Sequence, residues 1–208
     1  MSAAGATAVN SLFFGPVAVE PGMVVLTQGT GSVRCLAIQL ASAIGATVIS
    51  TSSEDSKLEI AKKLGAIYII NYRTYEDWAA EVLRLTDGKG VDHVVEVGGM
   101  GTIEQSIRST KQGGLISLVG FLASSEATDI VPSLIYGGKT ARGIFGSRKD
   151  MSRRLVQIVE QHGIHPMIGK TVEWPDAKEA FRVSMERSEE GKIVIRVWNS
   201  DGQGIIAK

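Results

Sequence analysis

The sequence has one cysteine, no excess of either charge and no long apolar run. With Cys35 alone, neither an intrachain disulfide nor a multi-cysteine metal site can form. The 22 basic residues balance the 22 acidic ones, so the formal net charge is zero, which argues against nucleic-acid and anionic-membrane partners. No window approaches the roughly 18 consecutive apolar residues of a membrane span.

The first residues and the composition set the expected compartment. The start MSAAGATAVN has no basic segment and does not resemble a signal peptide. Hydrophobic residues make up 44% of the chain and charged residues 21%, as is ordinary for a soluble globular protein. We therefore expect a cytoplasmic protein, whose 208 residues can hold one α/β domain with appendages.

The sequence contains a regular alternation of short apolar runs and helical patterns. Strands are expected at 23–28, 46–50, 67–70, 91–97, 115–120 and 139–145. Helices are expected at 32–44, 55–64, 75–85, 102–109 and 151–162. Short buried strands between helices predict βαβ units, and therefore a parallel sheet with helices on both faces.

The last forty residues depart from this alternation. Two short strands are expected, at 171–174 and in the run KIVIRVW. A helix lies between them, with Pro175 near its start and Gly191 past its end, which matches the usual placement of these residues at helix ends. Because the strands follow a complete doubly wound unit, they need another sheet to join.

The segment QGTGSVRC joins the first expected strand to the first expected helix. Gly29 and Gly31 have the spacing of G-x-G-x-x-G, the turn that cradles a dinucleotide pyrophosphate. Glycine lets the backbone approach the phosphates, and the helix N-terminus offers N–H groups and the positive end of its dipole. Arg34 replaces the third glycine, which normally serves helix–strand packing, so we expect Arg34 to occupy a packing position. A phosphate-binding turn is favoured over a merely structural one.

The end of the second expected strand bears on the choice of dinucleotide. NAD sites usually carry an acidic residue about twenty residues past the turn, on the ribose hydroxyls. Here Ser52 occupies that place, and together with Ser53 and Lys57 it could bind a 2′-phosphate, so NADP(H) is favoured over NAD(H). Glu54 and Asp55 are mildly unfavourable for a phosphate, and Ser53 or Asp55 could instead serve as a helix N-cap.

These motifs, taken in order, resemble the medium-chain dehydrogenase/reductase superfamily, and within it the zinc-type alcohol dehydrogenase-like and quinone oxidoreductase-like members. The resemblance spans about residues 3–197 and rests on three segments, which are VVLTQGTGSVRCLAIQLASAIGATVISTSSEDSKLEIAKKLGAIYIINYRTYEDW, GVDHVVEVGGMGTIEQSIRSTKQGGLISLVGF and GKIVIRV. It implies a Rossmann fold with strand order 3-2-1-4-5-6 over residues 1–168. A strand–helix–strand tail follows over 169–208.

The resemblance also implies which residues hold the cofactor. The matching positions are Gly29, Thr30, Gly31, Ser32 and Val33 for the pyrophosphate; Ser52, Ser53, Lys57 and Tyr72 for the adenosine 2′-phosphate; Gly98, Gly120, Phe121 and Leu122 along the groove; and Thr7, Phe145, Ser147 and Lys192 toward the nicotinamide.

Members of this superfamily carry a catalytic domain before the cofactor domain, with the zinc ligands where zinc is used and most of the substrate pocket. Because this sequence begins almost at the cofactor domain, the resemblance implies no zinc and no assignable catalytic residue. The tail is expected to pack on that catalytic domain, and without it TVEW and KIVIRVW would lack a partner sheet.

The three histidines give no convincing catalytic or metal site. His93 lies within an expected strand, where a structural role is favoured over catalysis. His162 and His165 follow a helix with no third ligand nearby, so a capping or surface role is favoured for both.

Three functions remain open. The favoured one is an NADP(H)-binding oxidoreductase that transfers hydride to a carbonyl or activated alkene of a small-molecule substrate. A second is a non-redox enzyme on the same scaffold, such as an isomerase, dehydratase or cyclase. A third is a binding or assembly module. For each of the three functions, the strand at 139–146 is expected to lie at a sheet edge and to pair with its copy in a homodimer.

Overall fold

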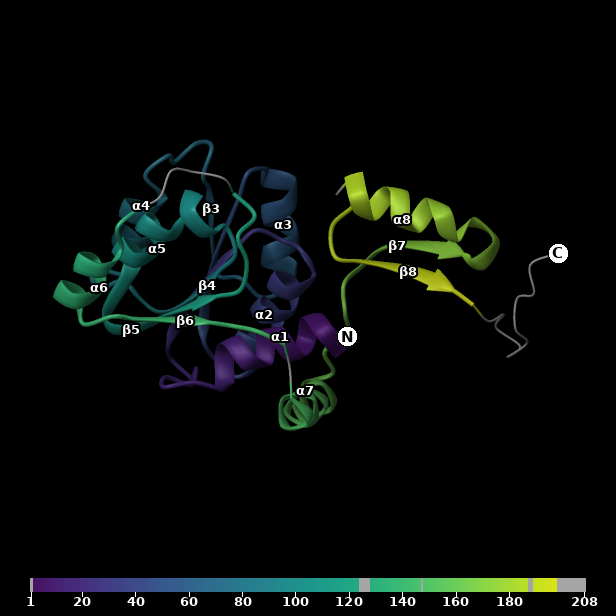
Figure 1. The fold of residues 1–208 in the computed structure, drawn as a ribbon, viewed down its shortest axis with the longest axis horizontal. Coiled ribbons are helices and arrows are strands. Elements are labelled where there is room, and N and C mark those ends of the chain that lie inside the picture. Colours follow the sequence, from purple (N-terminus) through teal and green to yellow (C-terminus); the bar gives the residue numbers. More distant parts are fainter. Residues whose placement is uncertain (1, 124–127, 147, 187–188, 198–208) are drawn as a thin grey trace. The chain divides into compact units, whose positions relative to one another are not determined.

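The computed structural model describes residues 2–123, 128–146, 148–186 and 189–197. The chain divides into two compact units, Met1–Ile164 and His165–Lys208. The first unit contains a parallel sheet with the strand order β3-β2-β1-β4-β5-β6 (Figure 1), which confirms the predicted doubly wound α/β fold. Its strands are β1 (Val24–Gln28), β2 (Thr47–Ser52), β3 (Tyr68–Asn71), β4 (Val91–Glu96), β5 (Thr110–Leu118) and β6 (Thr140–Gly143).

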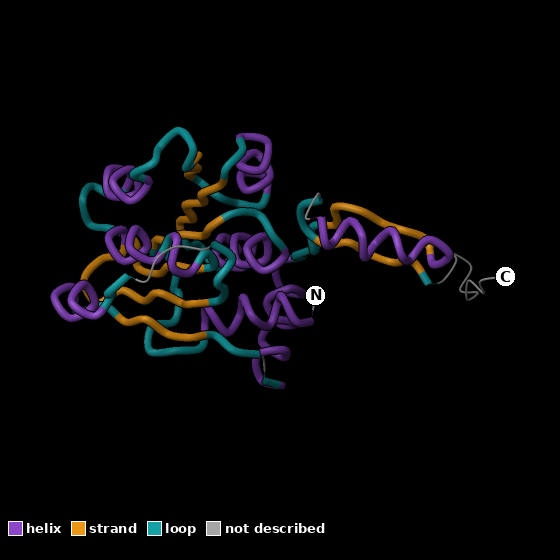
Figure 2. Tube along the Cα trace, turned by 45° about the horizontal axis from the view of Figure 1, so that its top comes forward, coloured by secondary structure: helices purple, strands orange, loops and turns teal. Residues whose placement is uncertain are grey.

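Helices cover both faces of this sheet (Figure 2). The helices are α1 (Ser2–Phe13), α2 (Ser32–Ala43), α3 (Asp55–Lys63), α4 (Trp78–Leu85), α5 (Ile103–Ser109), α6 (Val131–Gly137) and α7 (Lys149–His162). One apolar cluster packs α1, α2 and α7 on one face, and a second packs α4 and α5 on the other. In β1, Val25 belongs to the first cluster and Leu26 to the second, because successive strand side chains point to opposite faces. Burial on both faces explains the continuous apolar runs that predicted the strands.

Two features of the first unit differ from the sequence expectations. Helix α6 was not predicted, because its seven residues bury no side chain and so leave no helical apolar pattern; it ends at Gly138, whose φ is 54°. Strand β5 begins at Thr110, five residues before its expected start, because it continues directly from α5. Its pairing with β4 is irregular between Val91 and His93, where Gly113 and Gly114 lie in the partner strand.

The second unit is a strand–helix–strand arrangement. It comprises β7 (Ile168–Glu173), a 3₁₀ turn (Trp174–Asp176), α8 (Ala177–Glu186) and β8 (Lys192–Arg196). The expectation that the two tail strands lack a partner is wrong, since β7 and β8 pair with each other in parallel, with Val172 opposite Ile195. The helical crossover makes a parallel pair possible. The packing of this tail on a catalytic domain stays a prediction.

His93, on β4, is a core residue. Its side chain is fully buried, and its Nε2 lies 2.9 Å from the hydroxyl oxygen of Ser117 on β5. Burial lowers the pKa of this imidazole to about 4, and the nearby positive charge of Arg142 acts in the same direction. The ring is therefore neutral at pH 7.

This burial predicts a pH dependence of stability. Between about pH 6.5 and pH 4 the unfolded chain binds a proton at His93 and the folded chain does not, so the free energy of unfolding falls as the pH falls. The slope from this group is at most about 1.4 kcal/mol per pH unit. His93→Gln removes it. The free energy of unfolding of the wild type minus that of the variant, measured by urea unfolding at each pH, should therefore decrease from pH 7 to pH 4.5. A difference that is constant with pH would contradict the assignment.

Candidate functional site

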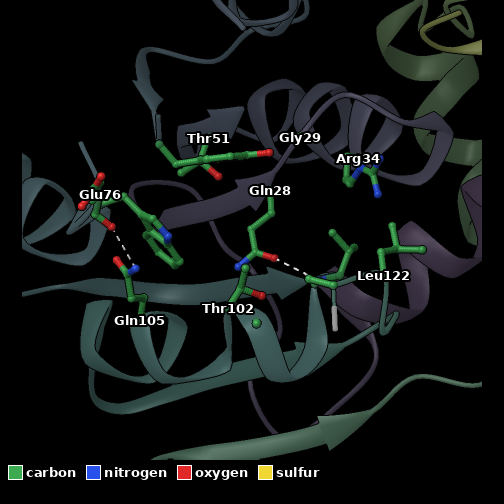
Figure 3. A pocket seen from close by; sticks show the side chains of 14 residues that line it. Gln28, Gly29, Arg34, Thr51, Glu76, Thr102, Gln105 and Leu122 are labelled. Atoms are coloured by element: carbon green, nitrogen blue, oxygen red, sulfur yellow. Dashed lines mark hydrogen bonds between the residues drawn. The ribbon is translucent and has the colours of Figure 1, made fainter. Parts of the chain in front are cut away.

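A pocket of about 540 Å³ lies at the carboxyl ends of the central strands (Figure 3). Its wall includes the last residue of β1, the turn after it, the loop that follows β4 and the starts of α4 and α5. Strands β1 and β4 are neighbours, and the helices that follow them pack on opposite faces of the sheet. This is the topological switch point, where doubly wound sheets bind their ligands.

The glycine turn between β1 and α2 forms one side of this pocket. Gly29 has a φ of 79°, a conformation that favours glycine, and its N–H donates to the carbonyl of Thr51 at 2.5 Å. The turn is thereby tied to the end of β2. Helix α2 begins at Ser32, and its N-cap is Gly31, which has no side chain with which to cap the helix. The first turn of α2 thus presents its positive dipole end at the pocket.

Arg34 lies over this turn. A β-carbon added to Gly31 would lie 2.8 Å from Arg34 Cζ, and one added to Gly29 would lie 3.5 Å from Arg34 Nε. Arg34 is the third residue of α2, and helical side chains lean toward the N-terminus over the preceding turn. The expectation of a packing position is therefore wrong, because Arg34 lines the pocket.

A buried amide–carboxylate contact joins the ends of β1 and β4 beneath the pocket. Gln28 is the last residue of β1 and Glu96 the last residue of β4. Gln28 Nε2 donates to Glu96 Oε2 at 2.7 Å, and the Gln28 side chain accepts at Oε1 from the N–H of Val97, 3.1 Å away. Glu96 is fully buried. The contact therefore fixes the loop after β4 relative to β1.

Glu96 also organises the loop that follows it. Its Oε1 accepts from the N–H groups of Gly98 and Gly99, at 2.7 and 3.0 Å, and from the Thr102 hydroxyl at 2.6 Å. Its Oε2 accepts from the hydroxyl of Ser106 on α5. A buried carboxylate is tolerated when its lone pairs are filled by donors in this way. The loop between β4 and α5 is consequently held in one shape.

The corner at the end of β2 contains the residues predicted for a 2′-phosphate. Ser52 is buried and Ser53 is half-buried. Lys57 Nζ lies 2.9 Å from Glu54 Oε1, and this hydrogen bond, with the positive charge of Lys57, lowers the pKa of Glu54. The N-cap of α3 is Glu54, so the alternative of Ser53 or Asp55 as the cap is wrong.

The structure brings four of the predicted cofactor residues to the pocket wall, which are Gly29, Tyr72, Gly98 and Leu122. Thr30, Gly31, Ser32 and Val33 lie in the adjoining turn and the start of α2.

The other predicted cofactor residues lie outside the pocket wall. The Thr7 hydroxyl donates to the Ala3 carbonyl within α1. Gly120 and the largely exposed Phe121 follow β5, and Phe145 is fully exposed. Ser147 lies outside the described residues, and Lys192 is the first residue of β8 in the second unit. The cofactor roles of these residues stay predictions.

Several pocket residues were missed by sequence reasoning. Gln28 and Thr51 stand at the carboxyl ends of buried strands, and their polarity in that place was an available signal. Trp78 and Gln105 gave no such signal, because helix packing brings them to the pocket. Gln105 accepts from the N–H of Ala79 and donates to the carbonyl of Glu76, at 3.1 and 3.0 Å, and so joins α5 to the start of α4.

Neither a metal cluster nor a membrane helix is found in the described ranges. No three histidine, cysteine, aspartate or glutamate side chains gather there into a group that could hold a metal ion. Of the helices described, none is long and apolar enough to cross a membrane.

Comparisons with known proteins agree on one family. A family model described as zinc-binding dehydrogenase matches residues 33–161. A zinc-type alcohol dehydrogenase-like protein of Schizosaccharomyces pombe is 41% identical over 199 residues, which are 93% of this chain and 58% of that protein. An L-threonine 3-dehydrogenase of Pyrococcus abyssi is 33% identical over 90% of this chain and 54% of that protein. The chain spans about half the length of the curated relatives it matches.

Solved structures show the same likeness. An NAD-dependent alcohol dehydrogenase superposes with a TM-score of 0.84 at 35% identity, over 93% of this chain and 56% of that one. A putative alcohol dehydrogenase from Sinorhizobium meliloti 1021 superposes with a TM-score of 0.85 at 34% identity, over the same shares of the two chains.

The network around Glu96 predicts the effect of its removal on stability. Glu96→Gln turns an amide N–H₂ toward buried donors, and we expect a loss of about 2–4 kcal/mol in the free energy of unfolding. The control is Glu59→Gln, which neutralises an exposed carboxylate paired with Lys62 on α3 and should leave the stability almost unchanged. Urea unfolding measures both. Equal stability of Glu96→Gln and wild type would show that the carboxylate does not hold the loop.

Proposed function

Since the chain belongs to the zinc-binding dehydrogenase family, we propose that its pocket binds a nicotinamide dinucleotide with the diphosphate over Gly31 at the start of α2. The observation that carries the proposal is the position of the pocket, at the switch point and beside the glycine turn. The similar structure named as an NAD-dependent alcohol dehydrogenase supports a cofactor of this class.

The glycines around the pocket let the segments that form its wall pack closely. At Gly31 the φ of −73° is ordinary, yet a β-carbon there would collide with the Arg34 guanidinium above the turn. At Gly98 a β-carbon would lie 2.7 Å from Thr102 Cγ2, and at Gly101 it would lie 2.7 Å from Ala123 Cβ. A side chain at any of these places would displace the neighbouring residue and so change the shape of the pocket wall.

The chain's own residues would bind and orient the dinucleotide. The N-terminal turn of α2 attracts the diphosphate. The Gln28–Glu96 contact keeps the loop after β4 in register with the glycine turn. Tyr72 and Trp78 give the far end of the pocket an aromatic wall suited to the adenine. When bound, the nicotinamide ring would supply or accept a hydride.

We extend the proposal to an oxidoreductase that acts on a carbonyl or activated alkene. The zinc-type alcohol dehydrogenase-like and L-threonine 3-dehydrogenase relatives carry names of enzymes that interconvert alcohols and carbonyls, which supports the carbonyl as the reacting group. The contribution assigned to this chain is to position the dinucleotide, and none of its residues is assigned the proton transfer.

The preferred dinucleotide in this proposal is NADP(H). The end of β2 carries Ser52 and Ser53 in place of the carboxylate that would bind ribose hydroxyls and repel a 2′-phosphate. Lys57 adds a positive charge to this corner, and its ion pair offsets the negative charge of Glu54.

The proposal predicts the effect of a new carboxylate at this corner. Wild-type protein, freed of carried-over nucleotide, should bind NADPH more tightly than NADH in calorimetric titration. Ser53→Asp should weaken NADPH binding roughly tenfold or more by charge repulsion and leave NADH binding nearly unchanged. Ser53→Asn, the uncharged control of the same shape, should preserve the preference. A wild-type protein that binds neither nucleotide would overturn the proposed function, and one that prefers NADH would overturn the choice of NADP(H).

We also propose a homodimer formed through the edge strand β6 (Thr140–Gly143). This strand ends the sheet, and the adjoining helix α6 exposes the apolar side chains of Ile135 and Tyr136. The N–H of Ile144 donates to the Leu118 carbonyl of β5, and donors alternate in direction along a strand. The N–H of Ala141 therefore points away from β5 and is available to a second copy.

This arrangement predicts the effect of a proline at the edge. Ala141→Pro removes an outward N–H without removing a hydrogen bond to β5. In sedimentation at micromolar concentration, wild type and the control Ala141→Ser should be dimers, and Ala141→Pro should be a monomer with its circular dichroism spectrum preserved. A monomeric wild type would contradict the proposal.

A further inference from the structure

The proposed dinucleotide site contains a feature that a glycine-rich turn alone does not explain. The position that completes G-x-G-x-x-G is occupied by Arg34, whose guanidinium lies over Gly31 and lines the pocket. Figure 3 shows this side chain on the pocket side of α2, next to Gly29. A large cation therefore lines the pocket beside the place where a diphosphate is proposed to bind.

The Arg34 charge lies close to the positive end of the α2 helix dipole. Arg34 belongs to the first turn of α2, where the helix dipole is positive and a basic side chain is unfavourable. An anion that contacts both the helix terminus and the guanidinium is attracted by both. A guanidinium carries five N–H donors in a planar fork that matches phosphate oxygens two at a time.

The backbone determines how far the guanidinium can reach. Gly31 has no side chain, so Arg34 can fold back three residues and come within contact distance of the turn. The pocket begins at this point, with Gly29 and Arg34 in one wall and Gly98 and Leu122 among the residues of the others. The Arg34 guanidinium thus lies beside the glycine turn in the pocket wall, and not in the core between α2 and the sheet.

We propose that Arg34 is a diphosphate-binding residue of this site, with its guanidinium and the adjoining N-terminus of α2 binding the diphosphate of the dinucleotide side by side. The glycine turn supplies backbone donors, and Arg34 supplies charged donors beside them. This inference rests on the proposed function, since it requires that the pocket take a dinucleotide. The opposite possibility is that Arg34 obstructs the turn, and the two possibilities predict opposite signs for its removal.

The test is calorimetric titration of the full chain and of three variants at Arg34. Arg34→Met removes the charge and keeps the length, Arg34→Lys keeps the charge and removes the fork, and Arg34→Gly completes G-x-G-x-x-G. The control Arg153→Met removes an exposed arginine of α7 and so changes the net charge equally, away from the pocket. Thermal unfolding of each protein without nucleotide shows that it is folded.

Three probes separate the parts of the ligand, which are NADPH, ADP and adenosine 2′-monophosphate. Because Arg34→Met and Arg34→Gly lose the charge-assisted hydrogen bonds of Arg34, their affinities for NADPH and for ADP should fall by about 10- to 100-fold. Arg34→Lys should lie between these variants and wild type, and Arg153→Met should match wild type. Binding of adenosine 2′-monophosphate, which has no diphosphate, should be unchanged in all variants. The affinity of wild type for ADP should also fall more steeply with salt than that of Arg34→Met.

The outcomes that overturn the inference are distinct from those that overturn the function. If wild type binds NADPH and Arg34→Gly binds it equally or more tightly, Arg34 does not bind the diphosphate, and the proposed dinucleotide site is retained. If the Arg34 variants lose affinity equally for ADP and for adenosine 2′-monophosphate, a contact between Arg34 and the diphosphate is also refuted. If wild type binds none of the three probes, the proposed function fails and the inference fails with it.

Discussion

The architecture of the site depends on one buried contact, the hydrogen bond from Gln28 to Glu96. These residues end the adjacent strands β1 and β4, between which the strand order of the sheet reverses. The contact therefore joins the two halves of the doubly wound fold. Glu96 then accepts hydrogen bonds from the following loop, and the carboxylate so helps to fix the position of that loop. A carboxylate with its lone pairs filled in this way is rigid, and a rigid wall is what a site needs to orient a flexible dinucleotide.

Much of the fold could be predicted from the sequence, because its strands are buried on both faces and separated by helices with clear ends. The order of apolar runs and glycines was sufficient for β1 to β4 and their helices. Helix α6 was not predictable, because no residue of it is buried and its pattern therefore carries no periodicity. The pairing of β7 with β8 was missed for a different reason. Hydrophobic patterning identifies strands, but it does not identify their partners.

The site was predictable in part. Gly29, Gly98 and Tyr72 follow strands whose carboxyl ends meet at one edge. The glycine spacing indicated Gly29, and the family resemblance implied Gly98 and Tyr72. Arg34 was assigned to packing because the third glycine of the motif usually has that role. The direction of a helical side chain, which leans back over the preceding turn, places Arg34 at the pocket instead. Motif spacing located the turn, and side-chain geometry was needed to decide what faces the ligand.

The most direct test of the central claim is a crystal structure of the full chain grown with NADPH. We expect a dinucleotide in the pocket between the ends of β1 and β4, with its diphosphate within hydrogen-bonding distance of the Gly31–Ser32 backbone and its adenine beside Tyr72. An NADPH molecule bound elsewhere on the chain would contradict the account. So would an empty pocket at a concentration of NADPH that saturates related dehydrogenases.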